Sequence, residues 1–289
     1  MTQGKTHQTG TTCSVFSNNQ FGCKKSFVFN KVICLSKAKK FSVPVRTSLI
    51  SIPKFYQFTD EFLMIEWKAD HLWYHSETYR CFGVDIGQRM TIVRLDDGSL
   101  LVHNPCELTE DIKTQIAVLG RVSCVTTVNQ SLHHPLSDWW LVYPDAYFYS
   151  APGLATKRTD IGFDGELTST TSPRWRNQLY QTVLRGNDQN EEVVFCDPNS
   201  RTLMVGESLI LLNHGSVLRR AVGKVSGCRQ HAKVPLTQRF QIKDPKLLRR
   251  SLQEILTWPF DHILPVHGDP IYHDGKTKLA EAYGWLLHR

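Results

Sequence analysis

The sequence predicts a layered α/β domain, because short apolar runs repeatedly give way to polar turns and then to helical patterns. Two observations support this prediction. Continuous apolar runs such as residues 122–128 are typical of strands that are covered on both faces. Amphipathic segments with capping residues, such as 244–259, are typical of helices that cover a sheet.

The first half of the chain begins with residues 60–83, where aromatic and polar residues alternate as in extended chain. Residues 89–95 and 99–105 form a predicted β-hairpin, because the intervening Asp-Gly pair tolerates the positive φ of a tight turn. The next predicted elements are a helix over 108–120 with Thr109 as N-cap and Gly120 as its stop, a strand over 122–128, a short helix over 136–146 and a strand and turn over 146–154.

The second half alternates strands and helices in the same way. The segment 244–259 is the clearest helix, because Asp244 caps it and Pro245 stands at its first position. The other predicted elements are strands over 178–186, 191–197 and 202–208, mixed helical pieces over 210–242, a strand ending in a polar turn over 261–271, and a terminal helix over 276–289.

The positive charge of the chain is concentrated at its start. The net charge of +7 comes from residues 1–59, which carry nine Lys or Arg and no acid, and leave 25 basic against 27 acidic side chains in residues 60–289. A nucleic-acid partner calls for a clustered basic face. We therefore expect no nucleic-acid partner, and the 289 residues indicate one large domain, 61–289, behind a basic extension, 1–60.

The composition of residues 1–60, acid-free, Ser-rich and basic, fits an organelle transit peptide, a flexible extension, or upstream sequence read from a misplaced start codon. No window offers the roughly 18 apolar residues of a membrane span, so no membrane partner is expected. The eight cysteines show no C-x-x-C spacing and fit a reducing compartment. We expect a cytoplasmic protein, or one in an organelle stroma or matrix if residues 1–60 are a transit peptide.

Polar residues gather at the ends of three predicted strands, in segments 129–138, 206–208 and 267–269. Ligands of open α/β sheets bind at the carboxyl ends of strands, so these segments are expected to meet. They carry imidazoles and carboxylates, which are ligands of zinc and iron.

The order of these elements over residues 89–285 resembles the metallo-β-lactamase-fold superfamily, whose first signature is H-x-H-x-D-H after an apolar strand. Here the signature reads N-x-S-x-H-H, on Asn129, Ser131, His133 and His134. The segments 89–105, 133–154 and 190–209 look like a branch of the superfamily known only as a domain of unknown function.

The resemblance implies a four-layer αββα sandwich and a degenerate metal site. The positions for one ion are Asn129, Ser131 and a residue in the histidine-free segment 185–192, so that ion is not expected. The positions for a second ion are His133, His134 and His267. The expected cofactor is therefore one zinc or iron ion at most, or none.

The activity implied is that of a metal-dependent hydrolase with an unknown small-molecule substrate. Zinc-bound water has a pKa of about 7 and supplies hydroxide. The late segments place Glu207, the counterpart of the superfamily's bridging aspartate, and Asp269 as proton acceptors or as partners that orient a histidine. The substrate pocket is expected to include Asn129, Ser131 and Asp138.

Structural roles for the same residues remain open. Asn129 and Ser131 can make turn or capping hydrogen bonds, while His133 and His134, whose side chains point in different directions, pack near the tryptophans that follow. The chain would then be a non-catalytic binding or regulatory member of the same fold. A third alternative is a redox protein with iron at the histidines.

Overall fold

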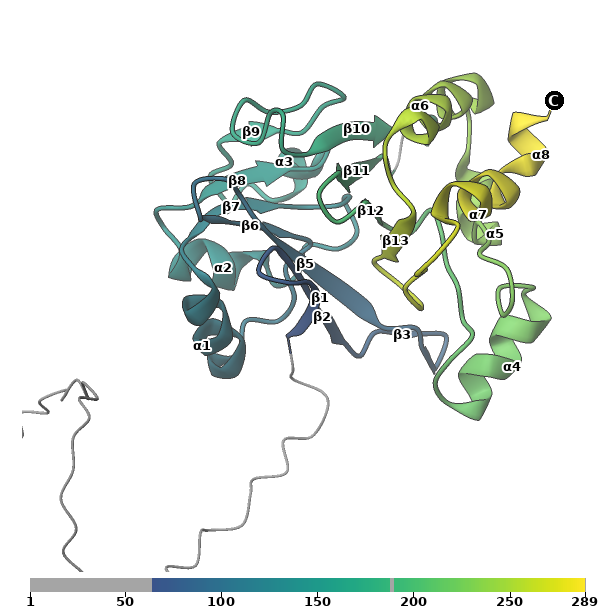
Figure 1. Cartoon of the computed structure of the whole chain (residues 1–289), viewed down its shortest axis with the longest axis horizontal. Coiled ribbons are helices and arrows are strands. Elements are labelled where there is room, and N and C mark those ends of the chain that lie inside the picture. The colour runs from purple at the N-terminus through teal and green to yellow at the C-terminus, as the bar shows by residue number, and fades with distance from the viewer. Residues whose placement is uncertain (1–63, 188–189, 289) are drawn as a thin grey trace, which may run out of the picture. The chain divides into compact units, whose positions relative to one another are not determined.

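The computed structural model describes residues 64–187 and 190–288 (Figure 1). The predicted extension 1–60 lies outside the described residues. Within the part of the chain that is described, no helix is long and apolar enough to cross a membrane.

The larger of two main sheets has seven strands in the order β1-β2-β5-β6-β7-β8-β9. Strands β1, β2, β5 and β6 pair antiparallel, and β6 to β9 pair parallel. A separate short hairpin, β3 with β4, follows β2. The strands are β1 (Ile65–Lys68), β2 (Leu72–Glu77), β3 (Arg80–Cys81), β4 (Val84–Asp85), β5 (Gln88–Arg94), β6 (Leu100–His103), β7 (Val122–Thr126), β8 (Tyr147–Ser150) and β9 (Gly165–Glu166).

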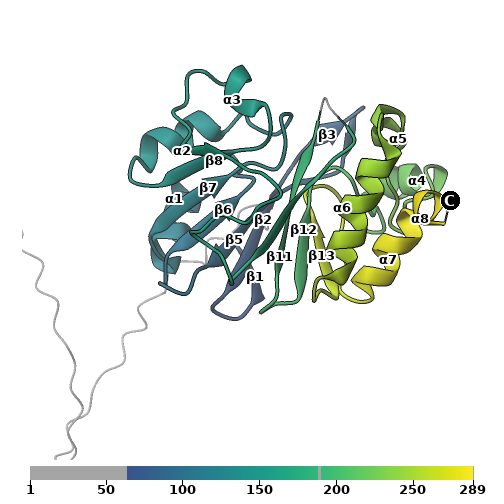
Figure 2. The ribbon, with the colours of Figure 1, turned by 90° about the horizontal axis from the view of Figure 1, so that it is seen from above.

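The smaller sheet has the order β10-β11-β12-β13, with a parallel pair only between β12 and β13. Its strands are β10 (Tyr180–Leu184), β11 (Glu192–Asp197), β12 (Thr202–Val205) and β13 (His262–Pro265). Figure 2 shows the two sheets face to face between two groups of helices, α1 to α3 beside the larger sheet and α4 to α8 beside the smaller. The helices are α1 (Glu110–Leu119), α2 (Leu136–Val142), α3 (Leu154–Lys157), α4 (Val217–Val225), α5 (Leu236–Gln241), α6 (Pro245–Thr257), α7 (Gly275–Ala282) and α8 (Gly284–Leu287).

The period-two pattern of the strands builds three apolar layers between these four layers of elements. In β6, Leu100 and Val102 face the helices α1 and α2, whereas Leu101 faces the other sheet. In β11, Phe195 joins the layer between the sheets, and Cys196 joins the layer under the helices α6 to α8. The expected four-layer αββα sandwich is therefore the observed architecture.

Most predicted elements are observed, including the hairpin of β5 and β6. Thr109 caps α1 by accepting from the backbone of Ile112, and Asp244 caps α6 by accepting from Lys246 and Leu247. The strand and polar turn expected over 261–271 are observed as β13 and the turn that follows Pro265. The terminal helix is shorter than predicted, because it is interrupted at Tyr283.

Four hydrogen bonds join the end of β13 and the turn after it to β5 and to the two residues before β5. The buried Arg89 of β5 donates to the carbonyl of Pro265 and, over 3.0 Å, to that of Gly268. Gly268 N donates to Ile86 O over 2.7 Å, and His267 Nδ1 pairs with Gly87 O over 2.5 Å. Burial lowers the pKa of Arg89 to about 10, so its guanidinium still carries a charge at neutral pH. These bonds determine where His267 lies.

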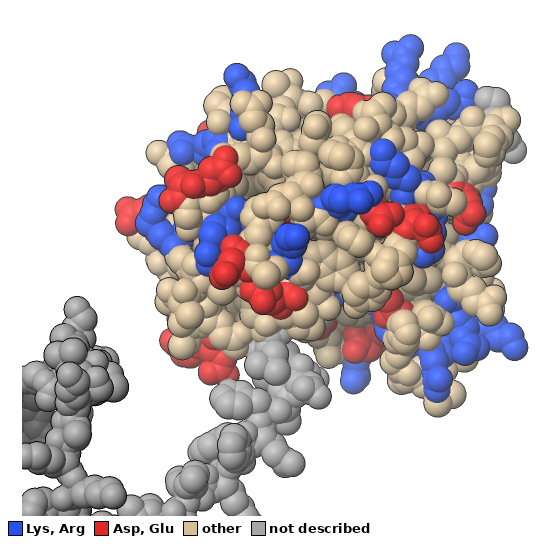
Figure 3. All heavy atoms as spheres, in the orientation of Figure 1, with Lys and Arg blue, Asp and Glu red and all other residues tan. Residues whose placement is uncertain are grey.

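Acidic and basic side chains are interspersed over most of the face shown in Figure 3. This distribution agrees with the near balance of 25 basic and 27 acidic side chains in residues 60–289.

Replacing Arg89 with methionine is expected to lower the free energy of unfolding by about 3 kcal/mol, because two buried carbonyls lose their donor at roughly 1–3 kcal/mol each. Relief of the buried charge offsets part of the loss. Urea unfolding at pH 7 measures the change. The matched control is Arg220→Met, at an exposed site, where a change within about 0.5 kcal/mol is expected. Equal stability of the two variants would contradict the idea that Arg89 stabilises the end of β13 and the turn after it.

Candidate functional site

Three of the predicted strand ends meet around the carboxylate of Glu207. Asn129 follows β7, Glu207 follows β12 and His267 follows β13. Asn129 Nδ2 donates to Glu207 Oε2 over 2.7 Å, and His267 Nε2 lies 3.6 Å from Glu207 Oε1. We call Asn129, Asn190, Glu207 and His267 the mouth cluster. The structure thus brings together one residue from each of the three polar segments.

Asn190 is the member of the mouth cluster that the sequence did not indicate. Its Nδ2 donates to Glu207 Oε2 over 3.0 Å, and its Oδ1 accepts from Ser131 Oγ over 3.3 Å. Asn129 Oδ1 accepts from the backbone of Ser131 and Leu132. Both side-chain amides therefore use their oxygens within the loops and direct N–H groups at the same carboxylate oxygen.

The surroundings of Glu207 favour its ionised form on balance. Burial disfavours the charge, but His267 and the amides of Asn190 and Asn129 together hold the pKa of the carboxyl below its ordinary value. About a fifth of the side chain remains exposed. Glu207 is thus a carboxylate at neutral pH.

His267 is held in one orientation. Its ring is stacked on that of Tyr79 at 4.7 Å between centroids, and its Nδ1 faces Gly87 O. Its Nε2 is buried and has no partner within hydrogen-bond distance among the described residues. The atom that faces Glu207 is therefore the nitrogen available to a proton or a ligand.

The two adjacent histidines have other surroundings. Arg158 donates to the backbone oxygen of His133 over 2.7 Å and lies 3.1 Å from its Nδ1. Burial, with the charges of His134 and Arg158, lowers the pKa of His133. His134 is exposed and lines a cavity.

The three predicted metal ligands His133, His134 and His267 do not form a compact set. Across residues 64–187 and 190–288, the one group of three or more His, Cys, Asp or Glu whose ligand atoms all lie within 4.8 Å of one another is Asp261, His262 and His273. That group is at the other end of β13 from His267.

Asp269, the other residue considered as a proton acceptor, is engaged in holding a loop. Its Oδ2 accepts from the backbone of Asn213 over 2.6 Å and of His214 over 2.8 Å. Its Oδ1 accepts from Arg219 over 2.9 Å. Asp269 therefore has a structural role, because these contacts hold the chain that leads into α4.

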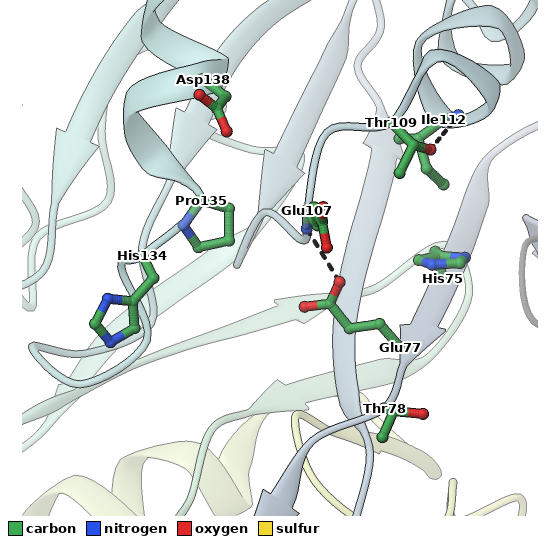
Figure 4. A pocket seen from close by; sticks show the side chains of 9 residues that line it. All are labelled: His75, Glu77, Thr78, Glu107, Thr109, Ile112, His134, Pro135 and Asp138. Carbon is green, nitrogen blue, oxygen red and sulfur yellow. Dashed lines mark hydrogen bonds between the residues drawn. The ribbon is translucent and has the colours of Figure 1, made fainter.

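An open cavity of about 590 Å³ lies beside residues 129–135, the signature loop, which carries the N-x-S-x-H-H pattern (Figure 4). Of the residues expected in a substrate pocket, Asp138 lines it, and Asn129 and Ser131 are not among its lining residues. Glu77 accepts from the backbone of Glu107 over 3.0 Å, and burial raises the pKa of Glu77. The cavity is lined by His75, Glu77, Thr78, Glu107, Thr109, Ile112, His134, Pro135 and Asp138.

A second buried carboxylate, Glu192 of β11, shapes the turn that carries Glu207. It accepts from Gly206 N over 2.6 Å, from Ser208 N over 2.9 Å and from Ser208 Oγ over 2.7 Å. A Cβ at Gly206 would lie 2.6 Å from a methyl of Val128, so only glycine fits between the two strands. Glu192 and Gly206 therefore position Glu207 without contributing to the mouth cluster.

Neither a scan against protein-family models nor a search of curated proteins finds a match to this sequence. Solved structures do match. They include metallo-β-lactamases from Pontibacter korlensis (15% identity, TM-score 0.54, covering 78% of this chain and 99% of that one) and from Hirschia baltica (7%, 0.54, 78% and 97%). Another is the metallo-β-lactamase FIM-1 from Pseudomonas aeruginosa in its mono-zinc form (10%, 0.53, 78% and 96%).

The chain has the metallo-β-lactamase fold. At these identities the likeness concerns the fold alone. The resemblance inferred from the sequence is thereby confirmed at the level of the fold.

The residues at the mouth of this metallo-β-lactamase fold do not fit a two-metal centre. At the positions implied for the first ion stand Asn129 and Ser131, and Asn190 lies in the segment implied to hold the third ligand. Amide and hydroxyl groups are not the usual ligands of zinc, which is bound by thiolate, imidazole and carboxylate. At the second position His133 lies against the cationic Arg158.

Sequence reasoning also missed the cavity residues that come from the start of the sheet. His75 and Glu77 lie in β2, before the span in which the metallo-β-lactamase resemblance was found. The signal that was available is the segment HSET at the end of an alternating strand, where polar side chains gather as they do at the other strand ends. Glu192 directly precedes a run of apolar residues, and its burial follows only from the tertiary structure.

The ionisation of Glu192 is expected to make the protein less stable as pH rises. Burial raises the pKa of Glu192 from 4.5 to about 7. The protonated carboxyl is therefore favoured in the folded state, and this contribution, full below about 4.5, is lost as pH rises through 7. The free energy of unfolding should fall by about 3 kcal/mol across that window from this group.

Urea unfolding from pH 4 to pH 8 measures the effect by comparison with Glu192→Gln, whose curve should lack this decline. Glu207, with its lowered pKa, acts in the opposite direction in both proteins and cancels in the comparison. Glu281→Gln, at an exposed site, is the control and should follow the wild type. Parallel pH curves for wild type and Glu192→Gln would refute the prediction.

Proposed function

We propose that this chain is a non-catalytic binding or regulatory member of the metallo-β-lactamase fold, from the uncharacterised branch that its sequence indicates. In this proposal the mouth cluster holds no metal. The observation that supports it most directly is the pairing of Glu207 Oε2 with two amide donors, at 2.7 Å from Asn129 and 3.0 Å from Asn190.

The physical reason is competition for the same lone pairs. Two N–H groups at hydrogen-bond distance occupy the acceptor capacity of Oε2 and direct the positive ends of their dipoles toward it. A divalent ion at that oxygen would have to displace both donors. It would then lie close to the positive ends of their N–H dipoles, which repel it. Because their oxygens are already bonded within the loops, neither Asn129 nor Asn190 can turn an oxygen toward an ion without losing those bonds.

The remaining gap, between Glu207 Oε1 and His267 Nε2, measures 3.6 Å, and the side chains on both sides of it are held by the chain itself. His267 Nδ1 pairs with Gly87 O, and Glu207 Oε2 accepts from Asn129 and Asn190. Neither side chain needs a ligand from outside the chain to keep its position.

In this proposal, the protein binds a small polar molecule that carries a positive charge. The cavity beside the signature loop is lined by the carboxylates of Glu77, Glu107 and Asp138, together with two imidazoles and no Lys or Arg. A cavity of about 590 Å³ is in the range of small-molecule sites. The excess of carboxylates favours an amine or another cation.

A second candidate function is hydrolysis with one zinc or iron ion held by Glu207 and His267. The specific observation in its favour is that His267 Nε2 is buried, has no hydrogen-bond partner among the described residues and lies 3.6 Å from Glu207 Oε1, near the ~3.4 Å that separates two ligands of tetrahedral zinc. When bound, zinc supplies hydroxide at neutral pH. His133, facing Arg158, would not contribute.

Glu207→Gln separates these functions. Its new amide oxygen can accept from Asn129 and Asn190, and its N–H can donate to His267 Nε2, so the variant should fold. We expect the zinc content of the full chain after dialysis against micromolar zinc to be the same in wild type and variant. We also expect no zinc-dependent hydrolysis of p-nitrophenyl acetate or bis(p-nitrophenyl) phosphate above a zinc blank.

Loss of one bound ion in Glu207→Gln, together with loss of a zinc-dependent hydrolysis seen in the wild type, would establish the second candidate and overturn the first. Glu281→Gln serves as the control for an exposed glutamate outside both sites.

A further inference from the structure

The start of β13 carries a cluster of metal-ligating side chains that lies away from the mouth cluster. Asp261 and His262 stand at the beginning of this strand, and His273 precedes α7. His267, by contrast, follows the end of the strand. The two sites are therefore at opposite ends of one strand.

The return of the chain after β13 brings His273 to this position. Residues 266–270 form a turn, and Ile271 then pairs antiparallel with Ile263 through two hydrogen bonds of 2.8 Å. Pairing of these residues places 272–274 beside 261–262. Two hydrogen bonds from the start of α7 stabilise this arrangement. Gly275 N donates to Asp261 O over 2.7 Å, and Asp274 N donates to Asp261 Oδ1 over 3.1 Å.

We propose that Asp261, His262 and His273 form a zinc site. One ligand atom from each of the three side chains lies within 4.8 Å of the others. Ligands of a tetrahedral zinc lie about 3.4 Å apart, since each bond is about 2.0–2.2 Å long. To close the remaining distance the side chain of His273, which is exposed, would have to turn toward the other two.

One ring nitrogen of His262 is held by the backbone. Its Nδ1 pairs with the carbonyl of Tyr272 over 2.5 Å, which selects the tautomer with hydrogen on Nδ1 and leaves the lone pair of Nε2 for a cation. Its ring also meets that of Trp67 edge to face, with 5.9 Å between centroids. A backbone carbonyl on the second ring nitrogen is the usual partner of metal-bound histidines.

The ligand set selects the class of ion. Two imidazoles and one carboxylate suit zinc, nickel and copper, whereas calcium and magnesium prefer oxygen ligands alone. Three protein ligands leave the fourth tetrahedral position to water. The bound ion would join the start of β13 to the turn before α7, so binding should raise the Tm.

The site is tested on the full chain with zinc as the probe. Wild type dialysed against micromolar zinc should retain one more zinc per chain than His273→Gln, and its affinity by competition with a chromogenic chelator should exceed that of the variant at least tenfold. Asp261→Asn, which keeps an acceptor for Asp274 N, should weaken binding similarly. Zinc should raise the Tm of wild type and not that of either variant. His231→Gln, an exposed histidine elsewhere, should behave as wild type.

Cobalt substitution gives a readout of coordination, because a tetrahedral site has a visible absorption that His273→Gln should lose. The inference does not depend on the proposed function. Equal zinc content in wild type, His273→Gln and Asp261→Asn would overturn it and leave the metal-free mouth intact. Loss of the zinc in Glu207→Gln instead would place the ion at the mouth and overturn both.

Discussion

The geometry of the mouth depends on the hydrogen bonds that the buried guanidinium of Arg89 donates to two backbone carbonyls. The guanidinium spans the two sheets at the end of β13 and binds carbonyls on both sides of His267. Without a donor those carbonyls would be buried and unsatisfied, and the turn 266–270 would keep only its other hydrogen bonds, such as those to Ile86 and Gly87. The distance between His267 and Glu207 is therefore determined by a residue of β5, almost 180 positions earlier in the chain.

The apolar layers account for the persistence of this fold at 7–15% identity to the solved structures it matches. Packing of the layers requires apolar side chains of suitable volume in a period-two pattern, which many sequences satisfy. The polar residues at the strand ends contribute little to those layers. They can vary while the sandwich remains, provided that each buried polar group finds a partner, as the amide of Asn129 does in Glu207.

The layered fold and most of its elements could be predicted from local patterns, because period, capping and turn residues act over a few positions. Thr109 and Asp244 are examples, since each caps the helix that follows it. The contacts of the site could not be predicted in this way. His133 is paired with Arg158, 25 residues away, and Asn190 with Glu207, 17 residues away, and only the tertiary structure brings them together.

The polar turn that ends β13 decides where two groups of side chains lie. A strand that continued to residue 271 would separate Asp261 and His273 by its length, about 3.3 Å for each residue. The chain instead ends the strand at Pro265 and turns at Gly268, whose φ of +84° and close approach to Leu211 O suit glycine alone. Ile271 then returns to Ile263. The same turn therefore presents His267 to the mouth and brings His273 back to His262, so the two ends of β13 depend on one backbone conformation.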